Sequence, residues 1–446
     1  MRQPSFISAK GEIMVLFYKI HRWVSLVCAL FFLLLVLTGL PLLFRDEINA
    51  WNTVNLPQKS EPMAMHSIWE ALPAGMEAVT AYAPDKRIRA VTPDPSDGTL
   101  YFLVESAGKD KERAHMRMGG EQIMYDVRSG EVFNRKNRQY RIPALQSFLH
   151  EAHLLHVQMK MGGAGRDFLA VMCVLTLLSI ISGLWIYAPL MKKLAFGKRR
   201  TTSTRLFWSD WHKLISVFTF GWAFLLTLSG IIIVCYSIGS DHYHREAPIV
   251  ARQQLFMQQS EMPHAYTPAE SLAMIQNQFP DKVVISMELP QDDATPYAFH
   301  LAEPPAKATN FMLGEMAFLP QAEHAESVLV PVPTWMKAAS FFLNLHIHSH
   351  DLLAEKIFWA LFILGTTAMV VTGVILYFTR WHNRIHTKHS PVKSNVAKPT
   401  ASWHEPFFFG LLTLLALVPP MYGNAGDVIG LAAMGVLLIY AMYAIL

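Results

Sequence analysis

The chain has 446 residues, of which 52% are hydrophobic and 16% are charged. Several apolar runs reach the roughly 20 residues that a helix needs to cross about 30 Å of hydrocarbon, so the composition excludes an ordinary soluble protein and indicates a membrane protein. The net charge of +4 reflects basic residues that cluster beside these runs, which indicates membrane topology and argues against a nucleic-acid partner.

The apolar runs predict a membrane α-helical bundle of about six spans. They lie at approximately 14–44, 167–190, 208–237, 352–380, 405–421 and 427–446. The last two predict a C-terminal helical hairpin. The first run is too long for the apolar core of a signal peptide and no small-residue cleavage site follows it, so we expect it to stay in the membrane.

Two short connections between the runs are rich in lysine and arginine. They contain Lys192, Lys193, Lys198, Arg199, Arg200 and Arg205 after the second run, and Arg380, Arg384, Lys388, Lys393 and Lys398 after the fourth. Because positively charged short loops stay on the cytoplasmic side, we expect both connections and the N-terminus to be cytoplasmic. The two long loops, 45–150 and 238–345, would then lie outside.

Each long loop has the pattern of a small α+β domain, a helix followed by antiparallel strands. The first loop predicts a helix over 67–82 and strand-like segments over 88–93, 99–106 and 120–133, with turns at Asp97-Gly98 and Ser129-Gly130. The second predicts a helix that Thr267 caps with Glu270, and strand-like segments over 282–289, 295–301 and 310–319. The sequence therefore predicts two small external domains.

One transmembrane sequence motif occurs twice, and each copy begins with a histidine. HRWVSLVCALFFLLLVLTGL begins at His21 and HKLISVFTFGWAFLLTLSGI begins at His212, an offset of 212 − 21 = 191. The same offset carries Arg22 onto Lys213, Thr38 onto Ser229 and Gly39 onto Gly230. The two copies predict that the chain contains an internal repeat.

A second set of residues repeats with an offset of 346 − 156 = 190. It carries His156 onto His346, Arg166 onto Lys356, Ser182-Gly183 onto Thr372-Gly373 and Tyr187 onto Tyr377. The sequence thus predicts a duplicated unit of helix, external domain and helix. We divide the chain into a first span with its N-terminal segment (1–44), a first external domain (45–150), an amphipathic segment with the second span and basic link (151–207), a third span (208–237), a second external domain (238–345), a fourth span with its basic link (346–400) and the hairpin (401–446).

The four repeated histidines predict axial ligands for two haems. With the N-terminus inside, His21 and His212 lie near the cytoplasmic face, whereas His156 and His346 lie near the external face. Neutral imidazole is the usual protein ligand of haem iron, and an ionisable group beside a membrane bundle is a functional candidate. Each pair also shares its depth with two Thr/Ser-Gly dipeptides from the other two helices, which would leave room for a haem. Close packing of helices would account for the glycines equally well.

Neighbouring histidines compete with two of these ligands. A continuous helix from His156 to Gly183 would measure about 40 Å at about 1.5 Å per residue, so residues 159–165 must bend the chain and leave 143–158 as a separate helix. On that helix His150, His153 and His156 follow one another at intervals of three residues, and His348 and His350 follow His346 at intervals of two residues. We favour His156 and His346 because only they are related by the repeat.

Repeated cations and the cysteines complete the candidate residues. Arg22, Lys213, Arg166 and Lys356 could pair with haem propionates, although snorkelling towards lipid headgroups explains each one as well. The three cysteines, Cys28, Cys173 and Cys235, fall within apolar runs. They indicate small packing residues and no disulfide framework in the external loops.

This set of motifs resembles the PepSY-associated transmembrane protein family over roughly residues 12–385. The resemblance rests on the His-Arg/Lys phrase that ends in Thr/Ser-Gly, on the YDVRSGEVF strand, on Leu-His ahead of Gly-Arg and on the span that ends Ser-Gly-Leu-Trp. It implies that the external domains are PepSY-like and periplasmic and that the protein lies in a bacterial inner membrane. The family includes iron-regulated inner-membrane proteins and di-haem ferric-siderophore reductases, so the resemblance implies an oxidoreductase with two b-type haems.

We therefore expect a ferric-siderophore or ferric-chelate reductase that receives electrons from a quinol or a cytoplasmic reductase. The sequence contains no phosphate-binding loop, dinucleotide-binding fingerprint or hydrolase triad. The cytoplasmic segments are too short for a flavin domain. Two alternatives stay open. One is a metal-binding protein or permease that uses external His and Met residues, and the other is a non-catalytic sensor or protease-regulating module.

Overall fold

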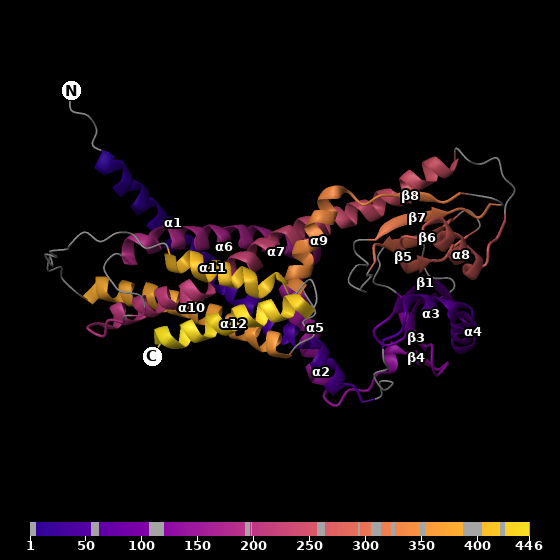
Figure 1. The fold of residues 1–446 in the computed structure, drawn as a ribbon, viewed down its shortest axis with the longest axis horizontal. Helices are drawn as coiled ribbons and strands as arrows, with labels where there is room; N and C mark the ends of the chain where they lie inside the picture. Colours follow the sequence, from indigo (N-terminus) through magenta and orange to yellow (C-terminus); the bar gives the residue numbers. More distant parts are fainter. Residues whose placement is uncertain are drawn as a thin grey trace, which may run out of the picture. The chain divides into compact units, whose positions relative to one another are not determined.

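The computed structural model describes residues 6–54, 62–106, 120–191, 197, 199–256, 264–292, 295–304, 314–322, 326–347, 353–386, 404–419 and 424–445. The chain forms two compact units, whose elements are labelled in Figure 1. The helical unit comprises Met1–Asn49, Ala144–Cys235 and Phe341–Leu446, and the sheet unit comprises Ala50–Pro143 and Tyr236–Ser340.

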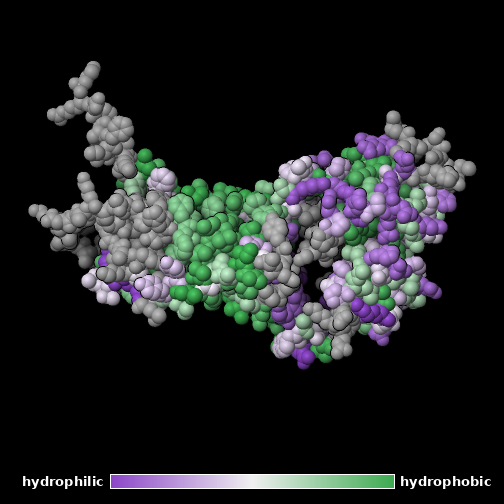
Figure 2. Space-filling model, viewed as in Figure 1, coloured by the Kyte–Doolittle hydropathy of each residue, from purple (hydrophilic) through white to green (hydrophobic). Residues whose placement is uncertain are grey.

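Within the described residues, five helices are long and apolar enough to cross a membrane. They are α1 (Phe6–Leu43), α6 (Gly162–Met191), α7 (Thr204–Phe256), α10 (Leu353–His386) and α12 (Asn424–Ile445). Hydrophobic residues form a broad green band on the visible face of this helical region in Figure 2. The sixth predicted span, 405–421, coincides with α11 (His404–Leu417), whose 14 residues reach only about 21 Å. The protein is therefore a multi-pass membrane helical protein, and the sixth span stays a prediction.

Helix α7 continues beyond the span predicted at 208–237. It has 53 residues, and its last turns cover positions that the sequence analysis assigned to the second external domain. The polar stretch after position 240 contains the good helix formers Arg245, Glu246, Ala247, Ala251 and Arg252, so polarity ends the membrane span without ending the helix. The hydroxyl of Tyr243, on this extension, donates to the Val330 carbonyl at 2.6 Å and accepts from the Met316 N–H at 3.0 Å, which fixes the extension within the sheet unit.

The sheet unit contains one antiparallel sheet in the order β4-β3-β2-β1-β5-β6-β7-β8. The first half of the chain supplies β1 (Lys86–Asp94), β2 (Thr99–Ser106), β3 (Glu121–Asp126) and β4 (Val132–Asn134), and the second half supplies β5 (Val283–Glu288), β6 (Tyr297–Ala302), β7 (Glu315–Leu319) and β8 (Val328–Val330). The predicted turns hold Gly98 and Gly130 with φ of 70° and 72°, values that glycine adopts without strain. The two halves meet where Ala90 and Val91 pair with Glu288 and Met287, so the expected pair of separate domains is one unit.

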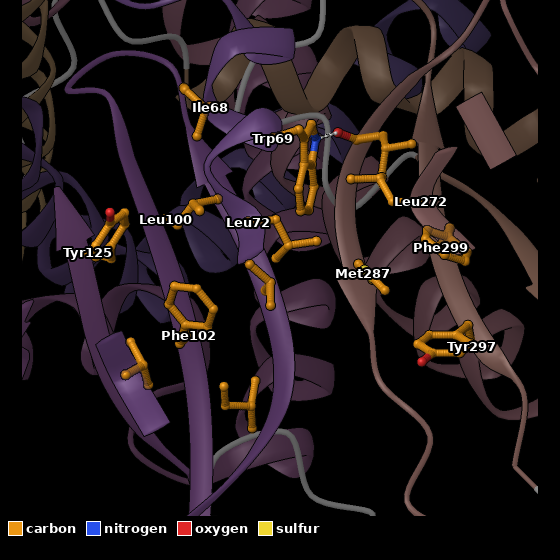
Figure 3. Packing of buried hydrophobic residues seen from close by; sticks show 14 of the residues in the cluster. Ile68, Trp69, Leu72, Leu100, Phe102, Tyr125, Leu272, Met287, Tyr297 and Phe299 are labelled. Atoms are coloured by element: carbon orange, nitrogen blue, oxygen red, sulfur yellow. Dashed lines mark hydrogen bonds between the residues drawn. The ribbon is translucent and has the colours of Figure 1, made fainter. Parts of the chain in front are cut away.

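Three helices pack on one face of this sheet: α3 (Met65–Glu70), α4 (Leu72–Tyr82) and α8 (Pro268–Gln278). Thr267 and Glu270 form the predicted capping box of α8. The helices bury a single apolar core with residues of both halves, which include Ile68, Leu72, Phe102, Ile275, Met287 and Phe299. Trp69 donates its indole N–H to the Val284 carbonyl at 2.8 Å and so ties the halves together (Figure 3).

Shorter helices flank the membrane helices. They are α2 (Arg45–Asn52), α5 (Pro143–Gln158) and α9 (Thr334–Ile347), with a 3₁₀ turn, η1 (Arg135–Asn137), after β4. Helix α5 is separate from α6, as the span length predicted, and the bend contains Met159, Lys160 and Gly162 at φ of 51°, 57° and 60°. In the helical unit α1 packs against α6 and α10, and α11 packs against α12.

Two histidine pairs as the candidate functional site

His156, on α5, lies against α1 in a specific arrangement. Its Nδ1 is 3.0 Å from the Leu35 carbonyl oxygen and 3.1 Å from Thr38 Oγ1. A Cβ atom added at Gly39 would lie 3.3 Å from His156 Cε1, so the imidazole takes the space that a side chain would fill. Since a carbonyl oxygen only accepts hydrogen bonds, Nδ1 carries the proton and Nε2 keeps its lone pair. We call this arrangement a histidine cradle.

His212, on α7, occupies the same kind of cradle on α10. Its Nδ1 is 3.0 Å from the Met369 carbonyl oxygen and 3.1 Å from Thr372 Oγ1. A Cβ atom at Gly373 would lie 3.2 Å from His212 Cε1. The carbonyl is again four residues before the glycine and the hydroxyl immediately before it.

The remaining two histidines complete the set. His21, on α1, lies with Nδ1 2.9 Å from the Ser179 carbonyl oxygen, and a Cβ atom at Gly183 of α6 would come within 2.8 Å of its Cε1. His346, on α9, has Nδ1 2.8 Å from Ser229 Oγ of α7, with 3.9 Å between its Cε1 and a Cβ atom at Gly230. All four predicted ligands thus share one orientation in which Nε2 is the nitrogen left to bind a metal.

The structure brings the four histidines together as two pairs. The ring centroids of the second pair, His156 and His346, are 6.3 Å apart with an angle of 51° between the planes. Two imidazoles on opposite sides of one metal ion, each bound at about 2 Å, would have centroids about 6 Å apart. Burial lowers the pKa of both histidines to about 4, so both are neutral at pH 7, the form that binds metals. The residues of this pair fit bis-histidine ligation of an iron.

The first pair, His21 and His212, lines a cavity of about 390 Å³ in the helical unit. Gly183 and Gly373 line it too, so the cradles open directly into the space. Its walls are largely apolar and include Phe32, Ile180, Val217, Phe220, Val370 and Val374. A volume of this order, between apolar walls and two free imidazole nitrogens, fits a flat apolar cofactor with a ligated metal.

The repeated cations occupy different environments. Arg22 and Lys213 line the cavity of the first pair, and Lys213 also lies 3.0 Å from Asp210 Oδ1. Lys356 is buried and forms an ion pair with Glu47 of α2. Arg166 Nε lies 3.7 Å from its neighbour Asp167. Of the four, Arg22 and Lys213 are thus placed beside the first histidine pair.

The competing histidines are distributed along α5 and beyond α9. His150 is exposed and His153 half-buried, whereas His348 and His350 lie outside the described residues. Within the described part of the chain, no group of three or more His, Cys, Asp or Glu side chains is close enough to hold a metal ion. The described residues therefore offer paired histidines and no classical metal cluster.

Two features of the site were not anticipated from the sequence. The hydroxyls of Thr38, Ser229 and Thr372 contact histidine Nδ1 atoms, whereas the Thr/Ser-Gly dipeptides were expected only to leave room for a haem. Their recurrence immediately before each glycine was the available signal. The second feature is Asp210, which holds Lys213 and for which the repeat gives no signal, since its counterpart at 210 − 191 = 19 is a lysine.

The helices, the paired histidines and the antiparallel sheet define a multi-pass membrane protein with a separate α+β unit. The model of the PepSY-associated TM region matches residues 18–380, most of the chain. The protein belongs to this family. Comparison with curated proteins gave no significant match.

Proposed function

We propose that this protein is an inner-membrane oxidoreductase with two b-type haems that reduces a ferric siderophore or another ferric chelate at the periplasmic face. The observation that carries the proposal is the histidine cradle, which recurs at all four repeated histidines. In each one the protein fixes the Nδ1–H tautomer and directs Nε2 away from the cradle, which is how proteins prepare imidazole for a metal.

The chain's own residues would hold two haems at different depths. Along α1, His21 of the first pair and Gly39, which cradles His156 of the second, are 39 − 21 = 18 residues apart, about 27 Å at about 1.5 Å per residue. The same 18 residues separate His212 from Gly230 on α7. Bound haems would supply one-electron transfer between the two faces of the membrane.

We also infer that the chain is a duplicated unit, with six spans and a cytoplasmic N-terminus. Each half supplies two membrane helices, a flanking helix with a cradled histidine, and four strands in the same order. The orientation follows from the arginines near the first pair, Arg199, Arg200, Arg205 and Arg380, which favour the cytoplasmic side. Electrons would therefore enter at the first pair, from a quinol or a cytoplasmic reductase, and leave at the second.

The chemical benefit of the reaction lies in iron release. Fe(II) carries less charge than Fe(III), so hard oxygen chelators such as siderophores hold it less strongly. Support for a ferric substrate comes from the family resemblance, and support for electron transfer comes from the two histidine pairs.

Haem content tests the first step of this proposal. Protein expressed with haem supplementation should contain about two non-covalent haems per chain in a pyridine haemochrome assay, since the sequence has no Cys-x-x-Cys-His motif. His21→Ala and His212→Ala should each remove the same haem signal, and His156→Ala and His346→Ala the other. His150→Ala is the matched control and should retain both. Less than about one haem per chain would exclude the proposal and favour the metal-binding or sensor alternatives.

Vectorial reduction tests the second step. In proteoliposomes of known orientation, chemically reduced protein should transfer electrons to a membrane-impermeant ferric chelate only from the face of the sheet-forming loops. His346→Ala should leave the first haem reducible and stop chelate reduction, because the electron would lack its second relay. Unchanged reduction by this variant would rule out the second pair as the exit site.

A further inference from the structure

The cavity of the first histidine pair has a strongly basic lining. Arg22, Arg205, Lys213 and Arg380 contribute to it, and none of the described residues that line it is Asp or Glu. Positive charge in a mostly apolar cavity is costly unless an anion balances it. The lining therefore suits an amphiphilic ligand with an apolar body and anionic groups at one edge.

Lys213 differs from Arg22 in that it has an acidic partner. Lys213 lies 3.0 Å from Oδ1 of Asp210, a residue that is only 3% exposed. Arg200 also binds this carboxylate, through Nε at 2.9 Å and Nη2 at 2.7 Å. Two cations thus share the charge of Asp210, and Lys213 is held towards it.

Arg22 has a different environment. Its guanidinium carbon lies 4.9 Å from the ring centroid of Trp23 and 5.4 Å from that of Tyr377, so aromatic faces fix its position without neutralising it. Its Nε is buried and has no hydrogen-bond partner among the described residues. A buried donor left unpaired costs about 1–3 kcal/mol, so this atom indicates an acceptor that a ligand supplies.

Arg380 is placed in a related way. Its guanidinium carbon lies 5.2 Å from the ring centroid of Tyr18, and both residues line the cavity. Arg22 follows the cradled His21 directly in α1, while Arg380 is on α10, the helix that cradles His212. Two arginines from different helices therefore accompany the two imidazoles.

We propose that Arg22 and Arg380 bind the carboxylate groups of the haem held by His21 and His212, and that Lys213 does not. This inference rests on the proposed function, since it concerns the same cofactor. Arginine suits the task because its planar fork binds a carboxylate through two hydrogen bonds and keeps its charge when buried. It alters the expectation from the repeat, which assigned Arg22 and Lys213 the same role.

The test compares haem with its dimethyl ester, in which both carboxylates are neutral. The protein carries His346→Ala, so that only the first pair binds, and is titrated in phosphatidylcholine nanodiscs while the Soret band is followed. This background should bind haem about 10- to 100-fold more tightly than the ester, the ratio expected for hydrogen bonds to a charged group. Adding Arg22→Gln should reduce this preference about three- to tenfold, and Arg380→Gln should reduce it too. The repeat-matched control, Lys213→Gln, should keep it.

Each outcome decides between distinct explanations. Ester binding by the Arg22→Gln variant at the background's affinity shows that the site is folded, and Arg22→Lys should restore part of the preference. A full preference in Arg22→Gln, or its loss in Lys213→Gln, would overturn the inference. If Arg22 instead holds an anionic lipid, Arg22→Gln would lower the co-purified phosphatidylglycerol and leave the haem preference intact, which also overturns it. Failure of the background protein to bind either compound would contradict the proposed function itself.

Discussion

The two halves of the chain, residues 6–191 and 204–386, build the same cradles with different tightness. In the first half a Cβ atom at Gly183 would approach the histidine ring to 2.8 Å and one at Gly39 to 3.3 Å. In the second half the equivalent distances are 3.2 Å at Gly373 and 3.9 Å at Gly230. Every cradle joins two helices of the same half, whereas each histidine pair joins opposite halves. Each half therefore orients its own imidazoles, and the space between the halves is where a ligated metal would lie.

The halves diverge where other elements attach. Gly221 of α7 corresponds to position 221 − 191 = 30, which is Leu30 of α1. A Cβ atom at Gly221 would lie 3.0 Å from the Thr413 side chain and 3.1 Å from Gly410 Cα, so the absent side chain lets α11 approach. Leu30 is 71% exposed in the described structure. Gly221 thus lets α11 approach the second half closely.

The largest effect should come from filling a tight cradle. Gly183→Ala would push His21 from its position, because no real Cβ tolerates 2.8 Å, and we expect loss of the haem signal of the first pair. Gly373→Ala and Gly39→Ala should lower haem content partly. Gly230→Ala, with ordinary contact distances, should retain both haems in the haemochrome assay. Equal retention by Gly183→Ala and Gly230→Ala would mean that cradle tightness does not control ligation.

The next effect concerns the hairpin. Gly221→Leu copies the first half and would force α11 away from α7, at a cost of about 1–3 kcal/mol typical of overpacking. Thermal unfolding of the detergent-solubilised protein, followed by tryptophan fluorescence, should show a lower Tm. Leu30→Ala is the matched control on α1 and should change Tm little, since the side chain is exposed. A Tm unchanged by Gly221→Leu would contradict the proposed reason for one-sided docking.

A smaller effect is expected from a Lys–Glu ion pair that occurs in both halves of the sheet. Glu121 binds Lys86 and Asn134, which hold its pKa at about 2, and Glu315 has a lowered pKa because Lys282 and Lys337 outweigh its burial. Because both pKa values are depressed on folding, the stabilisation is complete above the ordinary pKa near 4.5 and is lost at lower pH. For Glu121 it disappears as the pH falls towards 2.

Glu121→Gln and Glu315→Gln should each cost about 1–2 kcal/mol at pH 7 and less at pH 3. Hydrogen exchange of the full chain measures this as faster exchange in β3 or β7, after correction for the intrinsic rates. Faster exchange confined to the strand that carries the substitution would show that the two ion pairs stabilise their own halves of the sheet independently. An equal loss of protection in both strands from one substitution would instead show that they unfold together.

The smallest effect concerns the hydroxyl in a cradle. Thr372 Oγ1 lies 3.1 Å from His212 Nδ1, whereas Ser182, its counterpart in the first half, donates to the Ser179 carbonyl at 3.0 Å. An acceptor at Nδ1 makes the ligand more basic and favours Fe(III), so Thr372→Val should raise the midpoint potential of the first haem by about 20–60 mV. Ser182→Ala should shift it less in the same redox titration. A fall in potential, or equal shifts, would contradict this reading of the hydroxyls.

The four histidines and their glycines could be predicted from the sequence because the repeat placed them at matched offsets of 190 and 191. The bend at 159–165 was predictable as well, since span length alone required it. Asp210 could not be found this way, because its counterpart is Lys19 and no repeated pattern marks it. Pairing of β1 with β5 also escaped prediction, since strand periodicity shows which face is buried but not which edges meet.

That pairing has a consequence for how the protein can be divided. Within each half, β1 or β5 would be an edge strand with unpaired N–H and C=O groups, the kind of edge that aggregates or recruits a second chain. Here β1 and β5 pair with each other, with Ala90 opposite Glu288 and Val91 opposite Met287, so neither strand is an edge. A half expressed alone would expose this unpaired edge strand. Because the strand order of the second half mirrors that of the first, two identical halves could pair their edge strands and form a dimer.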